Sequence, residues 1–243
     1  MTTSLSDSSR FISISENIKV IRDEISDSAV KSGRKPDDVK LMAVTKTVDP
    51  IYINFAIEEC GIDLIGENKV QEFLSKRDEL KLDGVVKHLI GHLQTNKVRK
   101  IIDQVDMIQS VDSLRLAKAI SDAASNKSID VDILLEINIG DEESKTGFDK
   151  IEFNESLAEI SELPFLNVKG LMTIPPICED NLLLERYFDK MNEYFNEIKS
   201  SCLFGNDFNI LSMGMSGDYK EAILHGSNLV RVGSSIFGAR IYK

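Results

Sequence analysis

The chain has 243 residues, of which 42% are hydrophobic and 28% are charged, so it is long enough for one large α/β domain with a sizeable buried core. Its 40 acidic and 29 basic side chains give a net charge of −11, and no Lys/Arg run is dense enough to follow a phosphate backbone, so nucleic acid and anionic membranes are poor partners. The three cysteines are widely spaced, which argues against a disulfide framework and a zinc knuckle. No apolar run reaches the length of about 20 residues that a membrane span needs, and we expect a cytoplasmic protein.

The first predicted element is a helix near the N-terminus. Residues 1–14 are rich in Ser and Thr and lack the apolar segment of a secretion signal, so we expect them to form a flexible terminus. Beyond residue 15, apolar side chains recur at helical spacing until Gly33 and Pro36 end the pattern. The apolar positions of this predicted helix are Ile18, Ile21, Ile25 and Ala29.

Eight short, apolar, β-rich runs follow, and stretches of helical periodicity separate them. Consecutive apolar positions indicate strands covered on both faces, and the intervening helices supply the crossovers that parallel pairing requires. Eight such units in about 250 residues are typical of a closed (β/α)8 TIM barrel, and an open doubly wound sheet is the alternative. The runs are residues 39–46, 63–68, 85–92, 106–112, 131–138, 168–174, 208–215 and 228–233.

The predicted barrel lacks a conventional last helix. Only five residues follow Gly238, so no helix of ordinary length can come after the eighth run. We therefore predict that the opening helix packs against the barrel wall in that place. No internal repeat or linker divides the chain, and residues 15–243 are predicted to form one TIM-barrel domain with an extra N-terminal helix and no C-terminal β-domain.

Functional side chains of such barrels lie at the C-terminal ends of the strands. Lys46 ends the first apolar run, where it is either a reactive amine or a lysine whose ammonium reaches the rim. Asn68 ends the second run and His92 the third, where polar residues are expected in either case. Because His88 and His92 would lie about 13 Å apart along a strand, they are too distant to bind one metal ion, and no metal site is expected.

The last two runs suggest a phosphate site. Residues 213–216 end the seventh run and begin a helix, and residues 233–235 follow the eighth strand in the same manner. Barrels commonly bind a phosphate at these two loops through backbone N–H groups and a short helix N-terminus. Ser216 and Ser234 add hydroxyl donors, although ordinary Gly/Ser turns would have the same composition. Arg231 lies inside an apolar strand, where a guanidinium requires either an acidic partner or a ligand atom.

An amine, a phosphate cradle and an inward-facing arginine together suit a phosphorylated aldehyde. Seven segments then carry a family resemblance, in chain order over about residues 15–240: AVTKTVDP, GENKVQE, HLIGHLQTNK, IQSVDS, EINIGDEESKTGF, VKGLMTI and LSMGMSGDYKEAILHGSNLVRVGSSIFGAR. The sequence resembles the pyridoxal phosphate homeostasis protein family, also called the YggS or proline synthase co-transcribed family, which has the alanine-racemase-like fold type III.

The resemblance implies a role for each end of the cofactor pyridoxal 5′-phosphate (PLP). Lys46 would hold PLP as a Schiff base, and Arg231 would face its pyridine nitrogen. Ser216, Gly233 and Ser234 would hold the phosphate.

The resemblance also implies that Asn68, His92 and Met213 line the pocket. The sequence departs from the family pattern at Lys69, where Arg is usual, at Gly217, where an acid is common, and at Asn228, where Thr is common. None of these changes removes an implied contact with the cofactor, although Gly217 leaves the helix after Ser216 less firmly capped.

These features favour a protein that holds PLP without turnover. An arginine opposite the pyridine nitrogen disfavours protonation there, so the ring is a weak electron sink. Racemases of this fold take a second acid/base group from a C-terminal β-domain, which this chain lacks, so two-base proton exchange should be slow. We therefore expect a non-catalytic, monomeric protein of intracellular PLP (vitamin B6) homeostasis and amino/keto-acid balance, with apo PLP-dependent enzymes as recipients.

Two alternatives stay open at this point. A PLP-dependent amino-acid racemase or decarboxylase requires only an acid/base residue that the sequence does not reveal. A barrel enzyme acting on a sugar or heterocycle phosphate without PLP would share the phosphate cradle, which many barrels possess.

Overall fold

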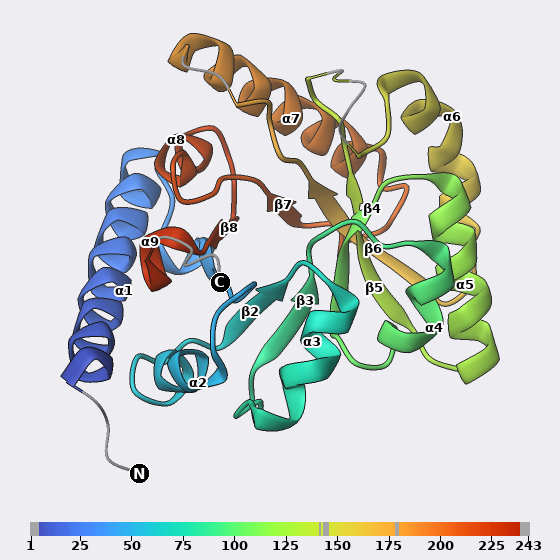
Figure 1. The fold of residues 1–243 in the computed structure, drawn as a ribbon. Coiled ribbons are helices and arrows are strands. Elements are labelled where there is room, and N and C mark those ends of the chain that lie inside the picture. Colours follow the sequence, from blue (N-terminus) through green and yellow to red (C-terminus); the bar gives the residue numbers. More distant parts are fainter. Residues whose placement is uncertain (1–4, 141, 143–145, 178–179, 239–243) are drawn as a thin grey trace.

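The computed structural model describes residues 5–140, 142, 146–177 and 180–238 (Figure 1). Within these residues, eight strands follow one another around a closed barrel in sequence order, and every neighbouring pair is parallel. The barrel closes where the first strand pairs with the last, with Lys40 opposite Leu229 and Ala43 opposite Val232. The predicted (β/α)8 barrel is therefore confirmed, and the open doubly wound sheet is wrong.

The strands coincide closely with the apolar runs of the sequence. They are β1 Lys40–Val44, β2 Leu64–Glu67, β3 Val86–Leu89, β4 Met107–Val111, β5 Val131–Glu136, β6 Leu166–Met172, β7 Ile210–Ser212 and β8 Leu229–Val232. The helices are α1 Leu5–Lys31, α2 Pro50–Glu58, α3 Val70–Lys76, α4 Val98–Ile101, α5 Leu114–Lys127, α6 Lys150–Ser161, α7 Asn181–Ser201, α8 Tyr219–Leu224 and α9 Ser234–Phe237.

Local capping fixes where several helices start. Asp49 accepts a hydrogen bond from the Ile51 N–H at the start of α2, and Pro50 occupies the first helical position, where no N–H is needed. Asp149 accepts from two N–H groups at the start of α6. Ser113 and Asp180 cap α5 and α7 in the same manner. These four crossover helices therefore each begin at a side chain that satisfies one or two of the free N–H groups.

The strands are buried on both faces, as their continuous apolar runs require. In β1, Met42 and Val44 pack with Leu64 and Leu229 of neighbouring strands inside the barrel, whereas Ala43 packs outward in a cluster that contains residues of α1 and α2. This alternation produces an interior filled by side chains and an outer layer between strands and helices. None of the described helices is long and apolar enough to cross a membrane.

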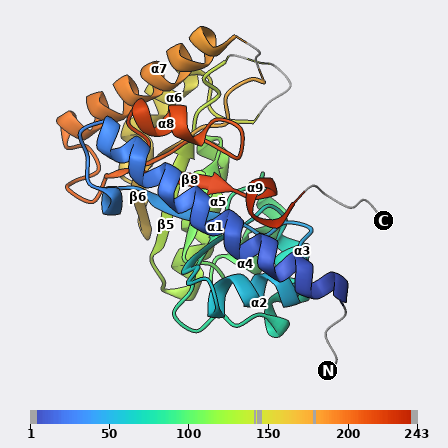
Figure 2. The same ribbon diagram turned by 90° about the vertical axis from the view of Figure 1, so that its left-hand side faces the viewer.

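Helix α1 takes the position predicted for it. It packs against α8 and α9, and Figure 2 shows it crossing this face of the barrel beside them. The Asn17 side-chain amide donates to the Ile236 carbonyl at 3.0 Å, and Tyr219 of α8 donates to the Glu24 carboxylate. The prediction that the opening helix covers the wall after β8 is confirmed.

The start of α1 differs from the expectation of a flexible terminus up to residue 14. The helix begins at Leu5, and Ile14 is buried. The Phe11 ring lies 5.5 Å from that of Tyr52 and 4.6 Å from that of Phe55, measured between centroids. Phe11 and Ile14 continue the helical stripe of apolar residues toward the N-terminus. The N-terminal part of α1 therefore also has an apolar face to bury. Residues 1–4 lie outside the described residues.

Candidate functional site

A cavity of about 760 Å³ lies at the mouth of the barrel, at the C-terminal ends of β1 and β8. Its volume is in the range typical of small-molecule sites. The loop from β7 to α8, helix α9, α2 and the first turns of α1 complete its wall. Six of the eight residues predicted from the sequence line this cavity: Lys46, Asn68, Ser216, Arg231, Gly233 and Ser234.

Lys46 follows β1 and is half-buried, and a buried network holds the residue before it. The Thr45 N–H donates to the Gly66 carbonyl at 3.0 Å, and its hydroxyl donates to the Glu67 carboxylate. The Thr45 carbonyl accepts a hydrogen bond from the Lys76 ammonium at 2.8 Å. Every polar atom of Thr45 is therefore bonded, which fixes the direction in which the chain presents Lys46.

The residue after Lys46 is held by the same network. Thr47 has a left-handed backbone with φ of 61°, uncommon for a residue other than glycine, and its N–H donates to the Glu72 carboxylate. Lys76 lies 2.5 Å from a carboxylate oxygen of Glu67 and 3.2 Å from one of Glu72. We call Glu67, Glu72 and Lys76 the ionic cluster. Burial raises the pKa of Glu67, and the Lys76 ammonium opposes that rise.

Arg231 enters the cavity from β8 and is almost fully buried, with 3% of its surface exposed. One terminal nitrogen of its guanidinium donates to the Ser212 hydroxyl at 2.6 Å, and the other donates to the Thr173 carbonyl at 2.7 Å. Burial lowers the pKa of Arg231 to about 10, and the Glu136 and Asp218 carboxylates oppose that shift. The guanidinium is therefore charged at neutral pH, and the acidic groups act on it from a distance.

The two C-terminal loops are tied together at the cavity. The Ser216 hydroxyl oxygen accepts from the Gly233 N–H at 3.2 Å and from the Ser235 N–H at 3.4 Å. A Cβ atom at Gly233 would lie 3.2 Å from both the Cβ and the carbonyl oxygen of Val44, so this loop approaches the end of β1 closely. The arrangement places Ser216, Gly233 and Ser234 around one end of the cavity, as the phosphate prediction requires.

Asn68 provides a direct sign of a missing partner. Its side-chain oxygen is buried and has no hydrogen-bond partner among the described residues. A buried acceptor left in this state costs about 1–3 kcal/mol. Asn68 as a residue lines the cavity, while this oxygen itself is buried behind the cavity surface.

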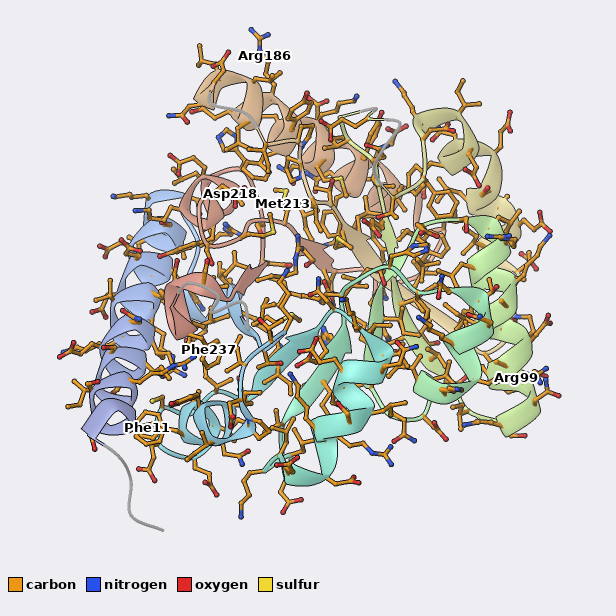
Figure 3. All side chains as sticks on the ribbon, viewed as in Figure 1. Phe11, Arg99, Arg186, Met213, Asp218 and Phe237 are labelled. Atoms are coloured by element: carbon orange, nitrogen blue, oxygen red, sulfur yellow. The ribbon has the colours of Figure 1, made fainter. Side chains whose placement is uncertain are left out.

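The structure does not bring His92 and Met213 into this cavity. His92 lies past the end of β3 with its Nδ1 2.8 Å from the Asp112 carboxylate, in a separate depression of about 360 Å³. Met213 is fully buried in the layer between strands and helices, and its carbonyl accepts from the Ser227 hydroxyl at 2.7 Å (Figure 3). Their contact with a cofactor stays a prediction.

The sequence prediction missed other lining residues, and among them Arg10, Tyr52 and Phe237 come from helices and not from strand ends. Arg10 of α1 lies 3.9 Å above the centre of the Tyr52 ring, and it donates to the carbonyl of Phe237 at 3.5 Å. Arg10, Tyr52 and Phe237 line the cavity from α1, α2 and α9. Arg10 lies in the segment expected to be flexible, and no motif marks it.

The mouth holds a further buried acid, Glu136, at the end of β5. The Thr146 hydroxyl donates to its carboxylate at 2.9 Å. Burial raises the pKa of Glu136 to about 7. The negative charge of Asp112 also raises this pKa, whereas the positive charge of Arg231 lowers it. Glu136 does not line the cavity, so it is a neighbour of the site with a proton that titrates near neutral pH.

The closed barrel, with a lysine after β1 and two joined Gly/Ser loops after β7 and β8, is the arrangement of an alanine-racemase-type barrel. Residues 13–241 match the family model described as "Alanine racemase, N-terminal domain". The pyridoxal phosphate homeostasis protein of Aquifex aeolicus is 38% identical over 231 residues, which cover 93% of this chain and 98% of that protein. The protein of the same name from Escherichia coli K12 is 37% identical, covering 94% and 97%.

A solved structure agrees with these relatives. PipY of Synechococcus elongatus PCC7942, determined with PLP bound, superposes with a TM-score of 0.81 at 30% identity, covering 93% of this chain and all of that one. The chain therefore belongs to the pyridoxal phosphate homeostasis protein family, as its sequence motifs predicted.

Proposed function

We propose that this protein binds PLP in the cavity at the barrel mouth and serves PLP (vitamin B6) homeostasis and amino/keto-acid balance without turnover. The observation that carries the proposal is the meeting of Lys46, Arg231 and the Ser216/Gly233/Ser234 cradle in one cavity of suitable volume. PLP supplies an aldehyde that condenses with a primary amine, a ring nitrogen that accepts a hydrogen bond, and a phosphate dianion.

The residues of the cavity fit each part of that molecule. Lys46 presents the amine from a fixed backbone, and Ser216 and Ser234 offer hydroxyl donors where the two loops meet. Asn68 offers an acceptor that lacks a partner in the described part of the chain. We therefore propose Lys46, Asn68, Ser216, Arg231, Gly233 and Ser234 as the PLP-binding residues, within one domain formed by residues 15–243.

Arg231 supports retention without turnover. A guanidinium can only donate hydrogen bonds, and with a pKa of about 10 it keeps its charge at neutral pH. A positive charge opposite the pyridine nitrogen disfavours a proton there, which weakens the electron withdrawal that PLP enzymes use. The protein would then hold PLP and release it to apo PLP-dependent enzymes, as a monomer in the cytoplasm.

Lys46→Ala tests this function most simply, with Lys69→Ala as the matched control because Lys69 is an exposed lysine outside the cavity. We expect the native protein and the control to take up PLP and acquire its visible absorption, and Lys46→Ala to lose that absorption. Equal uptake by all three proteins would contradict the proposal.

A PLP-dependent racemase or decarboxylase is the second candidate, and Glu136 is the observation that favours it. A carboxyl with a pKa of about 7 near the mouth is suited to general acid/base work. Incubating the PLP-loaded protein with each common amino acid, followed by chiral product analysis, separates the two functions. Multiple turnovers that Glu136→Gln abolishes would establish the enzyme and refute the carrier.

A further inference from the structure

A continuous path of buried side chains crosses the barrel interior and ends at Arg231. The Arg231 guanidinium donates to the Ser212 hydroxyl at 2.6 Å, and that hydroxyl donates to the Gln109 side-chain oxygen at 2.7 Å. The Gln109 amide nitrogen lies 2.8 Å from Nδ1 of His88. These residues come from β8, β7, β4 and β3, and none is more than 6% exposed.

The bond between Gln109 and Ser212 spans the barrel. Strands β4 and β7 are not neighbours, because β5 and β6 lie between them in the barrel order. Both side chains are fully buried. Barrel interiors of this kind are mainly filled by branched apolar residues, and a buried amide or hydroxyl is costly unless it is paired. Apolar packing alone therefore does not account for these buried polar side chains.

Arg231 sets the direction of the hydrogen bonds along the path, because a guanidinium can only donate. The Ser212 hydroxyl accepts that bond and gives its single proton to Gln109. The Gln109 amide group then donates to Nδ1 of His88, which must carry no proton. Burial lowers the pKa of His88 to about 4, so the ring is neutral at pH 7 and can accept. Every bond of the path thus points away from the cavity.

We infer that Ser212, Gln109 and His88 are positioning residues, which hold the Arg231 guanidinium in the one orientation that meets the pyridine nitrogen of PLP. The inference rests on the proposed function. Of these four residues only Arg231 lines the cavity, so the other three act through it. Thr173 fixes the second terminal nitrogen from the other side, and together the two bonds define the plane of the guanidinium.

Neutral partners suit this role better than a carboxylate would. An acid paired directly with Arg231 would compete with the ring nitrogen for its donors and cancel the charge that faces the ring. A hydroxyl backed by an amide and a neutral imidazole orients the group and leaves its charge intact. The path therefore sets geometry without changing the net charge of the site.

The experiment compares two ligands, PLP and its carbocyclic analogue 1-deazapyridoxal 5′-phosphate, which has C–H in place of the ring nitrogen. Ser212→Ala should weaken PLP binding about tenfold, the effect of one hydrogen bond to a charged group, and change analogue binding by less than about twofold. Gln109→Leu should produce a smaller selective loss. The balance of the absorption bands of bound PLP should shift in both variants.

Two further variants separate positioning from folding. Ser212→Cys leaves no cavity, since the thiol is slightly larger than the hydroxyl, but it offers only a weak acceptor, so it should show the same selective loss. Ser227→Ala removes another fully buried hydroxyl, one that donates to backbone carbonyls outside the path, and should affect both ligands equally or not at all. Equal losses of both ligands in the Ser212 variants, with unchanged spectra, would overturn the inference alone. A native protein that binds no PLP would overturn the proposed function as well.

Discussion

Two polar networks support the cavity, and they differ in chemistry. Behind Lys46, the ionic cluster of Glu67, Glu72 and Lys76 bonds to backbone atoms and thereby fixes the course of the chain. Behind Arg231, neutral side chains bond to the guanidinium and fix its orientation. Charged side chains can hold a stretch of backbone, as the ionic cluster does beside Lys46. Neutral side chains suit Arg231 better, because they leave the positive charge of its guanidinium available to the ligand.

We expect the largest effect from a substitution that breaks the ionic cluster. Lys76→Met removes the partner of the buried Glu67 carboxylate and should lower the free energy of unfolding by about 3–5 kcal/mol, measured by urea denaturation. The exposed Lys69→Ala should change stability by less than about 0.5 kcal/mol. Adding Glu67→Gln to Lys76→Met should recover much of the loss. If Lys76→Met is as stable as the control, the cluster does not hold this part of the structure.

Replacing Arg231 tests the residue that the network of neutral side chains holds. Arg231→Gln removes the donors toward the ring nitrogen and should weaken PLP retention by about 100-fold and change the absorption of bound PLP. Arg231→Lys keeps the charge but cannot bond to Ser212 and Thr173 as a planar fork, so it should rescue binding only in part. Unchanged affinity and spectrum in Arg231→Gln would place the residue outside the PLP contact.

Glu136 is a buried acid that belongs to neither network, and its pKa predicts a pH dependence. Its folded-state pKa of about 7 lies above the ordinary value, so the folded state binds more protons between about pH 4.5 and pH 7. Stability from this group is present at low pH and is lost as the pH rises through 7. Glu136→Gln should therefore gain about 3 kcal/mol relative to the native protein between pH 4.5 and pH 8. Parallel unfolding profiles over that range would contradict the shift.

The smallest expected effect concerns the phosphate cradle. Ser216→Ala removes the hydroxyl that joins the two loops and should weaken binding of PLP by about tenfold, with a smaller loss for unphosphorylated pyridoxal. Ser234→Ala should act in the same direction. Titrating both ligands by fluorescence or absorption decides the matter, since equal losses for the two ligands would count against a phosphate contact.

The fold was predictable because its signal is local and repeated. Eight apolar runs separated by helical stretches determined the strands, and Lys46, Ser216, Arg231 and Gly233 were placed by the rule that strand ends meet at the mouth. Side-chain direction beyond a strand end was not predictable. His92 lies past the end of β3, and its ring turns toward Asp112, away from the cavity.

The remaining differences have their own physical reasons. The aromatic contacts of Phe11 that extend α1 toward residue 5 join segments distant in sequence, so composition suggested a flexible terminus instead. Gln109 is, like Arg231, a polar residue inside an apolar strand. Its bond to Ser212 joins strands that are not neighbours, so the partner could be found only from the structure.

The covalent site of PLP tests the account most directly. The native protein is loaded with PLP, reduced with borohydride and digested, and the pyridoxyl adduct is located by mass spectrometry. We predict one modified residue, Lys46, with no adduct on the buried Lys76 or on the exposed Lys69. An adduct spread over surface lysines, or located on any lysine other than Lys46, would contradict the central claim.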